Sequence, residues 1–315
     1  MELILEKVFS AEQCEKFGLT LHTGGAGLKR KLTTPHIQKP GLLLTGLLDE
    51  LHSDRIQIFG SAEVRYLLTL TPEKLDRAMT LLTETRYPAI IVTRSLEVPP
   101  PLFDFCTSHD IPLYVTTLTT SVLIEDFTNY LNEILAPTVT IHGVLADVLG
   151  VGVLILGDSG IGKSECALDL VVAGYRLVSD DAVIIKRLPP HTLFGMASDV
   201  VKYHIEIRGL GIVNIKDLYG ITAIRERKQM DIVVELVKWE SDEEYERLGF
   251  EDKTYDILGV DLPYMKVPVT PGRSVATIVE VAARNQILKI MGQQPGRELL
   301  NNIDSAMHAN RKNGQ

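Results

Sequence analysis

Residues 151–164 read VGVLILGDSGIGKS, and this stretch decides how the second half of the chain folds and what it can bind. Six apolar or glycine residues, 151–156, predict a buried strand. They lead into residues 157–164, which complete the phosphate-loop pattern G-x-x-x-x-G-K-[ST]. Residues 165–172, ECALDLVV, favour a helix, whose N-terminus would attract anions. Strand, loop and helix in this order predict a site for a nucleoside triphosphate or another polyphosphate.

The residue types of this loop follow from the chemistry of phosphate binding. Glycines allow positive φ and let backbone N–H groups approach an anion closely. Lys163 would bring a positive charge to the β and γ phosphates, and the Ser164 hydroxyl could bind Mg²⁺. We expect the whole loop to take part in phosphate binding, through Gly157, Asp158, Ser159, Gly160, Ile161, Gly162, Lys163 and Ser164.

Composition narrows the class of protein. The chain has 315 residues, of which 45% are hydrophobic and 23% are charged, as in a soluble globular protein long enough for two domains. Its formal net charge is −9 and it has no basic run, which argues against a nucleic-acid partner. Cys14, Cys106 and Cys166 lack metal-ligand spacing, so we interpret them as reduced, mostly buried thiols of a cytosolic protein.

The sequence gives no sign of export or of membrane insertion. Glu2 and Glu6 stand where a secretory signal would need positive charge and an unbroken apolar run. Residues 134–157 are long and apolar enough to resemble a membrane span. Pro137, His142 and four glycines interrupt them, so two adjacent buried strands are expected instead. We therefore predict a cytoplasmic protein with no membrane partner.

The chain is expected to form two domains. Its first part alternates strand-like runs, such as residues 1–9, with helical ones, which is typical of an α/β domain. Residues 121–135 have helical periodicity and end just before Pro137, which makes a natural connector. We place the boundary there, with an N-terminal α/β domain of unknown role at 1–135 and a catalytic domain at 136–315.

Two polar patterns follow the phosphate loop. Asp180 and Asp181 end a predicted strand, where a Mg²⁺ ligand or a general base would lie in an open α/β sheet. A capped turn would have the same composition. His204, Glu206 and Arg208 alternate with apolar residues, so strand geometry would put them on one face. A solvated edge strand would show the same alternation.

Together these motifs resemble one family, the bifunctional HPr kinase/phosphorylases, over nearly the whole chain. In the second domain the resemblance is carried by His142-Gly143, GDSGIGKS at 157–164, Asp180-Asp181, IEIRGLGIVN at 205–214, Trp239 with YERLG at 245–249, and PVTPGR at 268–273. In the first domain, KPGLLLTG at 39–46 and RIQIFG at 55–60 are similar to the family's N-terminal segments.

The resemblance implies a cytoplasmic enzyme that phosphorylates a serine of the small phosphocarrier protein HPr. The donor would be ATP or pyrophosphate, with Mg²⁺ as cofactor. The resemblance also implies the reverse reaction, a phosphorolysis that yields pyrophosphate, together with a role in regulating carbon metabolism and assembly as a homohexamer. The second domain would be a P-loop kinase domain resembling phosphoenolpyruvate carboxykinase.

The family's site residues carry over position by position. Lys163 and the loop amides would hold the phosphates, and Ser164 with Glu206 would hold Mg²⁺. Asp181 would accept the serine proton in the forward direction and return a proton in the reverse direction. One carboxyl group can serve as base and acid in this way if burial and nearby phosphates raise its pKa.

The resemblance assigns further residues and also shows departures. His142 and Arg247 match the family's other catalytic positions, and residues 268–273 match the segment associated with dephosphorylation. Thr270 stands where the family usually has a basic residue, and Ser274 stands where Asn is common. The loss of a cation in this segment predicts a weaker reverse reaction.

Two other functions fit the phosphate loop. A kinase or carboxykinase-like enzyme acting on a small metabolite would use the same loop and the same base. A non-catalytic nucleotide sensor would need the loop and the Mg²⁺ ligands, but no base.

Overall fold

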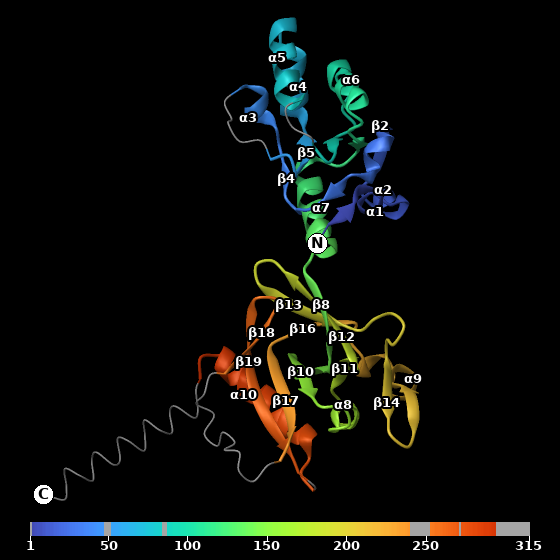
Figure 1. Ribbon diagram of the computed structural model, residues 1–315, viewed down its shortest axis with the longest axis vertical. Coiled ribbons are helices and arrows are strands. Elements are labelled where there is room, and N and C mark those ends of the chain that lie inside the picture. The colour runs from blue at the N-terminus through green and yellow to red at the C-terminus, as the bar shows by residue number, and fades with distance from the viewer. Residues whose placement is uncertain (1, 47–51, 84–86, 240–252, 271, 294–315) are drawn as a thin grey trace, which may run out of the picture. The chain divides into compact units, whose positions relative to one another are not determined.

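The computed structural model describes residues 2–46, 52–83, 87–239, 253–270 and 272–293 (Figure 1). The chain divides into two compact units, Met1–Ala136 and Pro137–Gln315, called unit 1 and unit 2 below. Both units combine helices with β-sheets, so the expected two-domain α/β organisation is confirmed.

Unit 1 is built on a five-stranded sheet with the order β2-β7-β6-β5-β4. The strands from β4 to β7 are parallel, and β2 runs antiparallel to β7 at one edge. The strands are β2 (Leu19–Thr23), β4 (Ile37–Gln38), β5 (Ile56–Phe59), β6 (Ile90–Val92) and β7 (Leu113–Thr116). The helices are α1 (Leu5–Val8), α2 (Ala11–Lys16), α3 (Gly41–Leu44), α4 (Ser61–Thr69), α5 (Pro72–Thr83), α6 (Pro100–Ser108) and α7 (Thr120–Ile134).

Both faces of the unit 1 sheet are buried, which explains why its parallel strands read as continuous apolar runs. Side chains alternate along β5: Ile56 and Ile58 pack into a cluster with Phe127 of α7. On the other face, Phe59 packs into a cluster with Leu82 of α5. The sheet is therefore a rigid support for the loops at its edges.

The N-terminus corrects one expectation. Residues 1–9 were expected to form a strand, but only β1 (Leu3–Ile4) is extended, paired with β3 (Lys31–Leu32). The chain then forms the short helix α1, in which Leu5 and Val8 are both fully buried. A helical turn puts residues three apart on one face, so the core takes both side chains at once.

Unit 2 contains a six-stranded sheet, a four-stranded sheet and a two-stranded hairpin. The six-stranded order is β11-β9-β10-β17-β19-β18 and the four-stranded order is β16-β13-β12-β8. The strands are β8 (Thr138–His142), β9 (Val144–Val148), β10 (Val151–Gly157), β11 (Arg176–Ser179), β12 (Ala182–Leu188), β13 (Thr192–Met196), β14 (His204–Ile207), β15 (Gly211–Asn214), β16 (Arg227–Gln229), β17 (Ile232–Lys238), β18 (Thr254–Ile257) and β19 (Val260–Val269). The helices are α8 (Lys163–Val172), α9 (Ile215–Tyr219) and α10 (Val275–Ile290).

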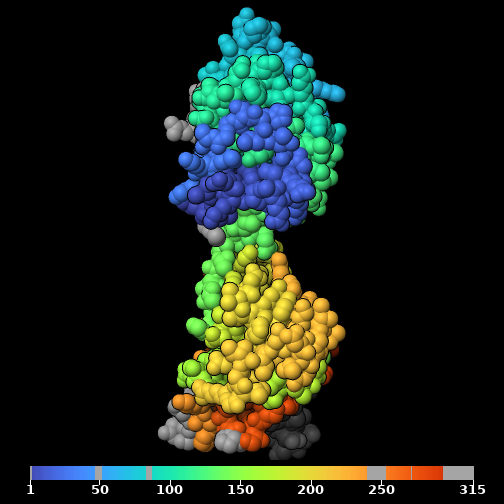
Figure 2. Space-filling model, turned by 90° about the vertical axis from the view of Figure 1, so that its right-hand side faces the viewer, coloured from blue at the N-terminus to red at the C-terminus, as the bar shows by residue number. Residues whose placement is uncertain are grey.

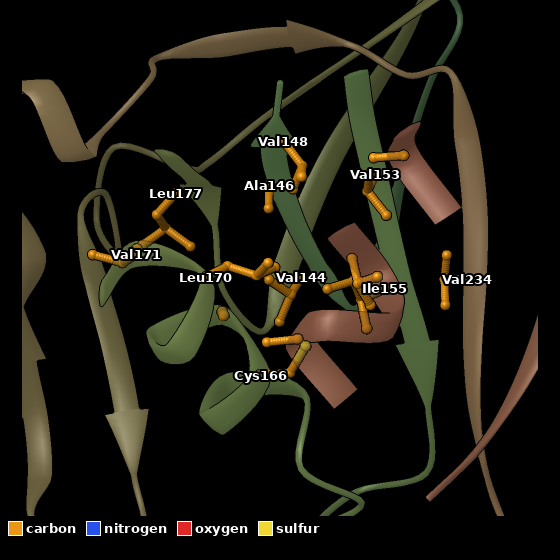
Figure 3. Close-up of a cluster of buried hydrophobic side chains, with 14 of the residues drawn as sticks. Val144, Ala146, Val148, Val153, Ile155, Cys166, Leu170, Val171, Leu177 and Val234 are labelled. Atoms are coloured by element: carbon orange, nitrogen blue, oxygen red, sulfur yellow. The ribbon is translucent and has the colours of Figure 1, made fainter. Parts of the chain in front are cut away.

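The central strand β10 is buried on both faces. Val153 and Ile155 point into a cluster that includes Cys166 and Leu170 of α8 (Figure 3). Between them, Leu154 packs into a second cluster with side chains of the four-stranded sheet. Helices thus cover one face of the six-stranded sheet, and the smaller sheet covers the other.

The apolar stretch at 134–157 contains two adjacent buried strands, as expected. β9 and β10 pair antiparallel, with Val148 opposite Val151. No helix in the described part of the chain has the length and apolar character that crossing a bilayer requires.

Candidate functional site

The phosphate loop lies between β10 and α8, as its sequence predicts. Gly157, Gly160 and Gly162 all have positive φ, at 141°, 77° and 108°. A Cβ on Gly157 would lie 2.5 Å from the carbonyl oxygen of Leu236 in the neighbouring strand β17. Glycine is therefore required both by the turn and by the close approach of the next strand.

Lys163 is bound to its own loop. Its Nζ donates hydrogen bonds to the carbonyl oxygens of Gly157, at 2.8 Å, and Asp158, at 3.0 Å. The ammonium group is thus held across the loop, at the start of α8. A phosphate oxygen is a stronger acceptor than a carbonyl oxygen, so the same ammonium group can bind phosphate from this position.

Ser164 is joined to a buried carboxylate. Its hydroxyl lies 2.9 and 3.0 Å from the two carboxylate oxygens of Asp180, which follows β11. Oδ2 of Asp180 also accepts a hydrogen bond from the backbone N–H of Glu206, at 3.3 Å. Three segments distant in sequence therefore meet at one carboxylate.

The surroundings of Asp180 suit a divalent cation. Asp180 is only 5% exposed, and burial is the main cause that raises the pKa of its carboxyl group, against the lowering effect of the Ser164 hydrogen bond. A buried carboxylate is stabilised by a counter-charge. Hydroxyl and carboxylate oxygens are ligands that Mg²⁺ prefers. Asp180 thus belongs with Ser164 and Glu206, although the sequence singled it out only as half of an acidic pair.

The described residues contain no cluster of three or more His, Cys, Asp or Glu side chains that could hold a metal ion. In nucleotide sites, Mg²⁺ is commonly held by one or two carboxylates together with substrate phosphates and water.

Asp181 differs sharply from its neighbour. It lies at φ 65° and its side chain is 82% exposed. Its Oδ1 lies 3.5 Å from Nδ1 of His142, whose side chain is 87% exposed. The backbone holds the pair together, because the N–H of Gly143 donates to the Asp181 carbonyl at 3.0 Å and β8 pairs with β12 beside it. The result is an accessible carboxylate next to an accessible imidazole.

Arg208 lies against the phosphate loop. A Cβ on Gly160 would be 2.4 Å from a guanidinium nitrogen of Arg208, so this cation packs directly on the glycine. The sequence placed Arg208 on one strand face with His204 and Glu206. Strand β14 ends at Ile207, so Arg208 lies in the turn after the strand and does not continue its face. Nδ1 of His204 lies 2.8 Å from the backbone carbonyl oxygen of Lys202.

Three parallel strands bring the remaining segments to the same edge of the sheet. β10 pairs with β17 up to Gly157 opposite Leu236, and β17 pairs with β19 up to Lys238 opposite Val269. The segment after Val269, with Thr270 and Arg273, therefore begins at the edge that carries the phosphate loop. Arg247 lies outside the described residues, as does residue 271.

Cys166 lies in the first turn of α8, within one turn of the loop. It is 3% exposed, and burial raises the pKa of its thiol to about 12. Cys106 is also buried, and Cys14 is partly buried, so the expected mostly buried thiols are confirmed.

The hairpin that carries Arg208 and the elements after it expose large apolar side chains. Leu210, Ile212, Leu218 and Ile221 are between 63% and 72% exposed, and they come from the β14–β15 hairpin, α9 and the 3-10 turn after it. These elements contact one another, and the same hairpin supplies Arg208 to the loop. We call these four side chains the apolar surface.

Known families match both units. The family described as HPr Serine kinase N terminus matches residues 9–131, and the one described as HPr Serine kinase C-terminal domain matches residues 133–303. The chain belongs to the HPr serine kinase family. A family relative from Geobacter sulfurreducens, named HPr kinase/phosphorylase, is 49% identical over 89% of this chain and 88% of its own length.

Other HPr serine kinase relatives are also similar. A protein of the same name from Brevibacillus brevis is 43% identical, covering 95% of this chain and 93% of its own. A solved structure of the Hpr(Ser) kinase/phosphatase from Coxiella burnetii is 31% identical, with a TM-score of 0.46, over 54% of this chain and 97% of that chain.

Proposed function

We propose that this protein is an HPr kinase/phosphorylase. In the forward direction it transfers a phosphoryl group from ATP or pyrophosphate to a serine hydroxyl of HPr, which releases ADP or phosphate and one proton. In the reverse direction inorganic phosphate takes the phosphoryl group from phosphoserine, which yields pyrophosphate and the free serine. One observation carries this proposal. Asp181 and His142 form an exposed pair, and Asp181 directly follows Asp180, whose carboxylate accepts a hydrogen bond from the Ser164 hydroxyl.

Asp181 is proposed as the group that exchanges the proton. It is accessible, and it directly follows the residue that is hydrogen-bonded to the phosphate loop. As a carboxylate it accepts the proton of the attacking serine. In the reverse direction the protonated acid returns a proton to the departing serine oxygen, as microscopic reversibility requires. His142, 3.5 Å away, is proposed to orient this carboxylate.

The phosphates are proposed to be held by Lys163 and the amides of the loop. Phosphoryl transfer needs mainly positioning and neutralisation of charge, and the loop, Lys163 and Arg208 supply both. Arg247 is proposed as a further cation on the basis of its match to the family.

From the match to the family, a Mg²⁺ ion would be held by Ser164 and Glu206, together with the Asp180 carboxylate that Ser164 contacts. The backbone N–H of Glu206 donates to the same carboxylate, which supports placing Glu206 near it. When bound, this ion supplies positive charge that offsets the charge of the phosphates. Asp180 itself holds the Ser164 hydroxyl in place, so the loop and β11 keep a fixed geometry.

The apolar surface favours a protein acceptor over a small metabolite. Four large apolar side chains project into solvent from the hairpin that carries Arg208 and from the two elements that follow it, and exposed apolar patches are typical of protein contact sites. The yellow and gold segment that carries them covers much of the face of unit 2 seen in Figure 2. A metabolite kinase or a nucleotide sensor would not need such a surface.

The wider setting is proposed from the family alone. It comprises a cytoplasmic location, a role in regulating carbon metabolism, a homohexamer, and a P-loop domain resembling phosphoenolpyruvate carboxykinase. Light scattering of the purified protein would test the hexamer, and a monomer at micromolar concentration would contradict it.

One experiment separates the candidate functions. The purified protein is incubated with Mg²⁺, ATP or pyrophosphate, and HPr. Acid-stable phosphoserine on HPr supports the proposal. Turnover without any protein acceptor would indicate a metabolite kinase, and nucleotide binding without transfer would indicate a sensor.

The reverse reaction is tested with phosphorylated HPr and inorganic phosphate, by measuring pyrophosphate. In the segment 268–273, Thr270 stands where the family usually has a basic residue. Because this segment therefore carries one positive charge fewer, we expect phosphorolysis to be slower than the kinase reaction.

A further inference from the structure

Unit 1 contains a pocket of about 670 Å³ that the proposed reaction does not use. Its walls are β2, the end of β7, the segment 95–98 and the start of α6. In Figure 2 the blue N-terminal segment and the teal segment around α6 lie side by side on the surface of unit 1, as β2 and α6 do in Figure 1. The volume is within the usual range for small-molecule sites.

The pocket lies where α/β sheets commonly bind ligands. β6 and β7 are parallel, and the pocket residues Ser95 and Thr117 follow the carboxyl ends of these strands. β2 starts at the same edge, because Leu19 pairs with Thr116. On β2, Thr20 and His22 are two residues apart, so they share the face that lines the pocket.

The wall of the pocket is held in an uncommon backbone conformation. Arg94 and Ser95 are consecutive non-glycine residues with positive φ, at 63° and 49°. Their N–H groups donate to the carbonyl oxygens of Leu118, at 2.9 Å, and Thr116, at 2.8 Å. Two successive residues in this region are costly, and such strain is concentrated at binding and catalytic sites.

Further hydrogen bonds fix the other walls. The Thr116 hydroxyl donates to the Phe17 carbonyl at 2.6 Å, which joins the end of β7 to the segment before β2. The hydroxyls of Thr23 and Thr107 lie 2.8 Å apart and join the end of β2 to α6. The pocket is therefore formed before any ligand binds, which reduces the entropic cost of binding.

The chemistry of the lining selects a positively charged ligand. Glu97 and Asp104 line the pocket, and no described residue forms a hydrogen bond or ion pair with either carboxylate. None of the described residues that line the pocket is Lys or Arg. His22 is the one described lining side chain that can carry a positive charge, against the two carboxylates, so the lining disfavours a phosphorylated or carboxylated ligand.

The same lining provides an apolar side. Phe103, 37% exposed, lines the pocket together with Leu96 and Val98. The aromatic ring and the aliphatic side chains offer a surface that buries the apolar part of a ligand.

We propose that this pocket binds a small organic ammonium compound, that is, an amine with a compact apolar body. Glu97 and Asp104 pair with the ammonium group, and Phe103 packs against the apolar body. Thr20 and Ser95 also line the pocket, and their hydroxyls are available to hydrogen-bond the ammonium group. This inference concerns unit 1 and does not depend on the proposed reaction.

The test uses three probes of nearly equal size on the full-length protein. Benzylamine carries the ammonium group, benzyl alcohol is its neutral analogue, and benzoate reverses the charge. Saturation-transfer difference NMR titrations measure the affinity of each. We expect benzylamine to bind at least about fivefold more tightly than either other probe.

Variants of pocket residues, compared with a control variant outside the pocket, test whether benzylamine binds in this pocket. The double variant Glu97→Gln, Asp104→Asn should weaken benzylamine binding about fivefold or more, and Phe103→Ala should weaken all neutral and cationic probes. Asp126→Asn removes an exposed carboxylate of α7 in the same unit, outside the pocket, and should leave the affinity unchanged.

Equal binding of the three probes, or unchanged binding by the double variant, would overturn the proposal. Because both carboxylates are exposed, the double variant should keep the thermal unfolding temperature of the unaltered protein, which shows that a lost affinity is not a lost fold. Transfer to HPr is measured in parallel, so failure of the pocket and failure of the proposed reaction give different results.

Discussion

At the scale of single residues, two adjacent aspartates have very different surroundings, and the backbone turns between them. Asp180 is 5% exposed and bound to Ser164, whereas the side chain of Asp181 is 82% exposed and lies beside His142. The positive φ of Asp181 turns the chain between them. One carboxylate is therefore suited to a buried cation, and the other to proton exchange with an acceptor from solvent.

Replacement of Asp181 by Asn should remove proton exchange and keep the shape of the site. We expect the rate of phosphoserine formation to fall about 10²- to 10⁴-fold, the usual contribution of a general base. Nucleotide affinity, measured by calorimetry, should change little, because Asp181 makes no hydrogen bond to the loop through its side chain in the described structure. Turnover at the unaltered rate would show that another group takes the proton.

Replacement of Asp180 by Asn should change the stability of the protein and its response to ligands, which the Asp181 replacement should leave nearly unchanged. Burial raises the pKa of Asp180, so the folded protein binds its proton more tightly than the unfolded chain does. The ionised group therefore costs stability at neutral pH, and this cost disappears as the pH falls below the ordinary Asp pKa. Without metal, we expect the variant to unfold at a higher temperature than the unaltered protein at neutral pH, with no such gain in acid.

The same variant should respond less to Mg²⁺ and nucleotide. Scanning calorimetry with and without both ligands measures the stabilisation, which should be smaller than in the unaltered protein because one oxygen ligand has lost its charge. A variant that is less stable than the unaltered protein at neutral pH in EDTA would contradict this account of Asp180.

At the scale of elements, long periodic segments were predictable and contacts between segments were not. The strand at 151–156 and the helix at 165–172 are confirmed as β10 and α8, because both carry a strong local pattern. Residues 1–9 mix apolar residues with Glu2, Glu6 and Lys7 in a pattern that fits a strand, but the core takes Leu5 and Val8 from one helical turn. The local sequence did not distinguish a strand over this segment from the short helix α1.

For the candidate site too, the local motif was predictable and the contacts between distant segments were not. The phosphate-loop motif specified the position of Lys163 and Ser164 between strand and helix. The contact between Arg208 and Gly160 joins residues far apart in the chain, and its only signal was that Arg208 alternates with apolar residues after Glu206. The bond between Ser164 and Asp180 depends on which aspartate turns inward, and that depends on the backbone at Asp181.

The loop element can be tested with a matched pair of glycines. Gly160→Ala must accommodate a φ of 77° and a Cβ 2.4 Å from Arg208. Gly174→Ala, after α8, meets a similar φ of 92° with nothing within 4 Å of its Cβ. Both should destabilise the protein by about 1 kcal/mol through backbone strain.

Only the loop variant should also lose ligand affinity. We expect Gly160→Ala to weaken nucleotide binding about tenfold or more, and Gly174→Ala to leave it within about twofold. Calorimetric titration measures both. Equal affinities of the two variants would mean that the contact of Arg208 with the loop has no part in binding.

At the scale of the whole molecule, each unit has its own core. The clusters around Phe127 and around Phe59 lie in unit 1, and those around Ile155 and Leu154 lie in unit 2. A unit with a complete core can fold independently. The helical stretch at 121–135 that ends before Pro137 predicted a boundary between two such units, but only the structure shows how each sheet is ordered.

The fragment 137–315 should therefore fold without unit 1. We expect its circular dichroism to show one cooperative thermal transition, with a midpoint within about 5 °C of a transition of the full-length protein. The fragment should also bind nucleotide, since every described residue of the phosphate site belongs to unit 2. A broad, non-cooperative transition would show that unit 2 needs unit 1 to complete its packing.

The buried position of Cys166 has a practical consequence. A thiol within one turn of the phosphate loop would usually make an enzyme vulnerable to air and to alkylating reagents. With its pKa near 12 and its sulfur shielded beneath α8, almost none of it is thiolate under physiological conditions. Electrophilic inhibitors aimed at this cysteine should fail against the native protein, and unit 2 can be handled without reducing agents.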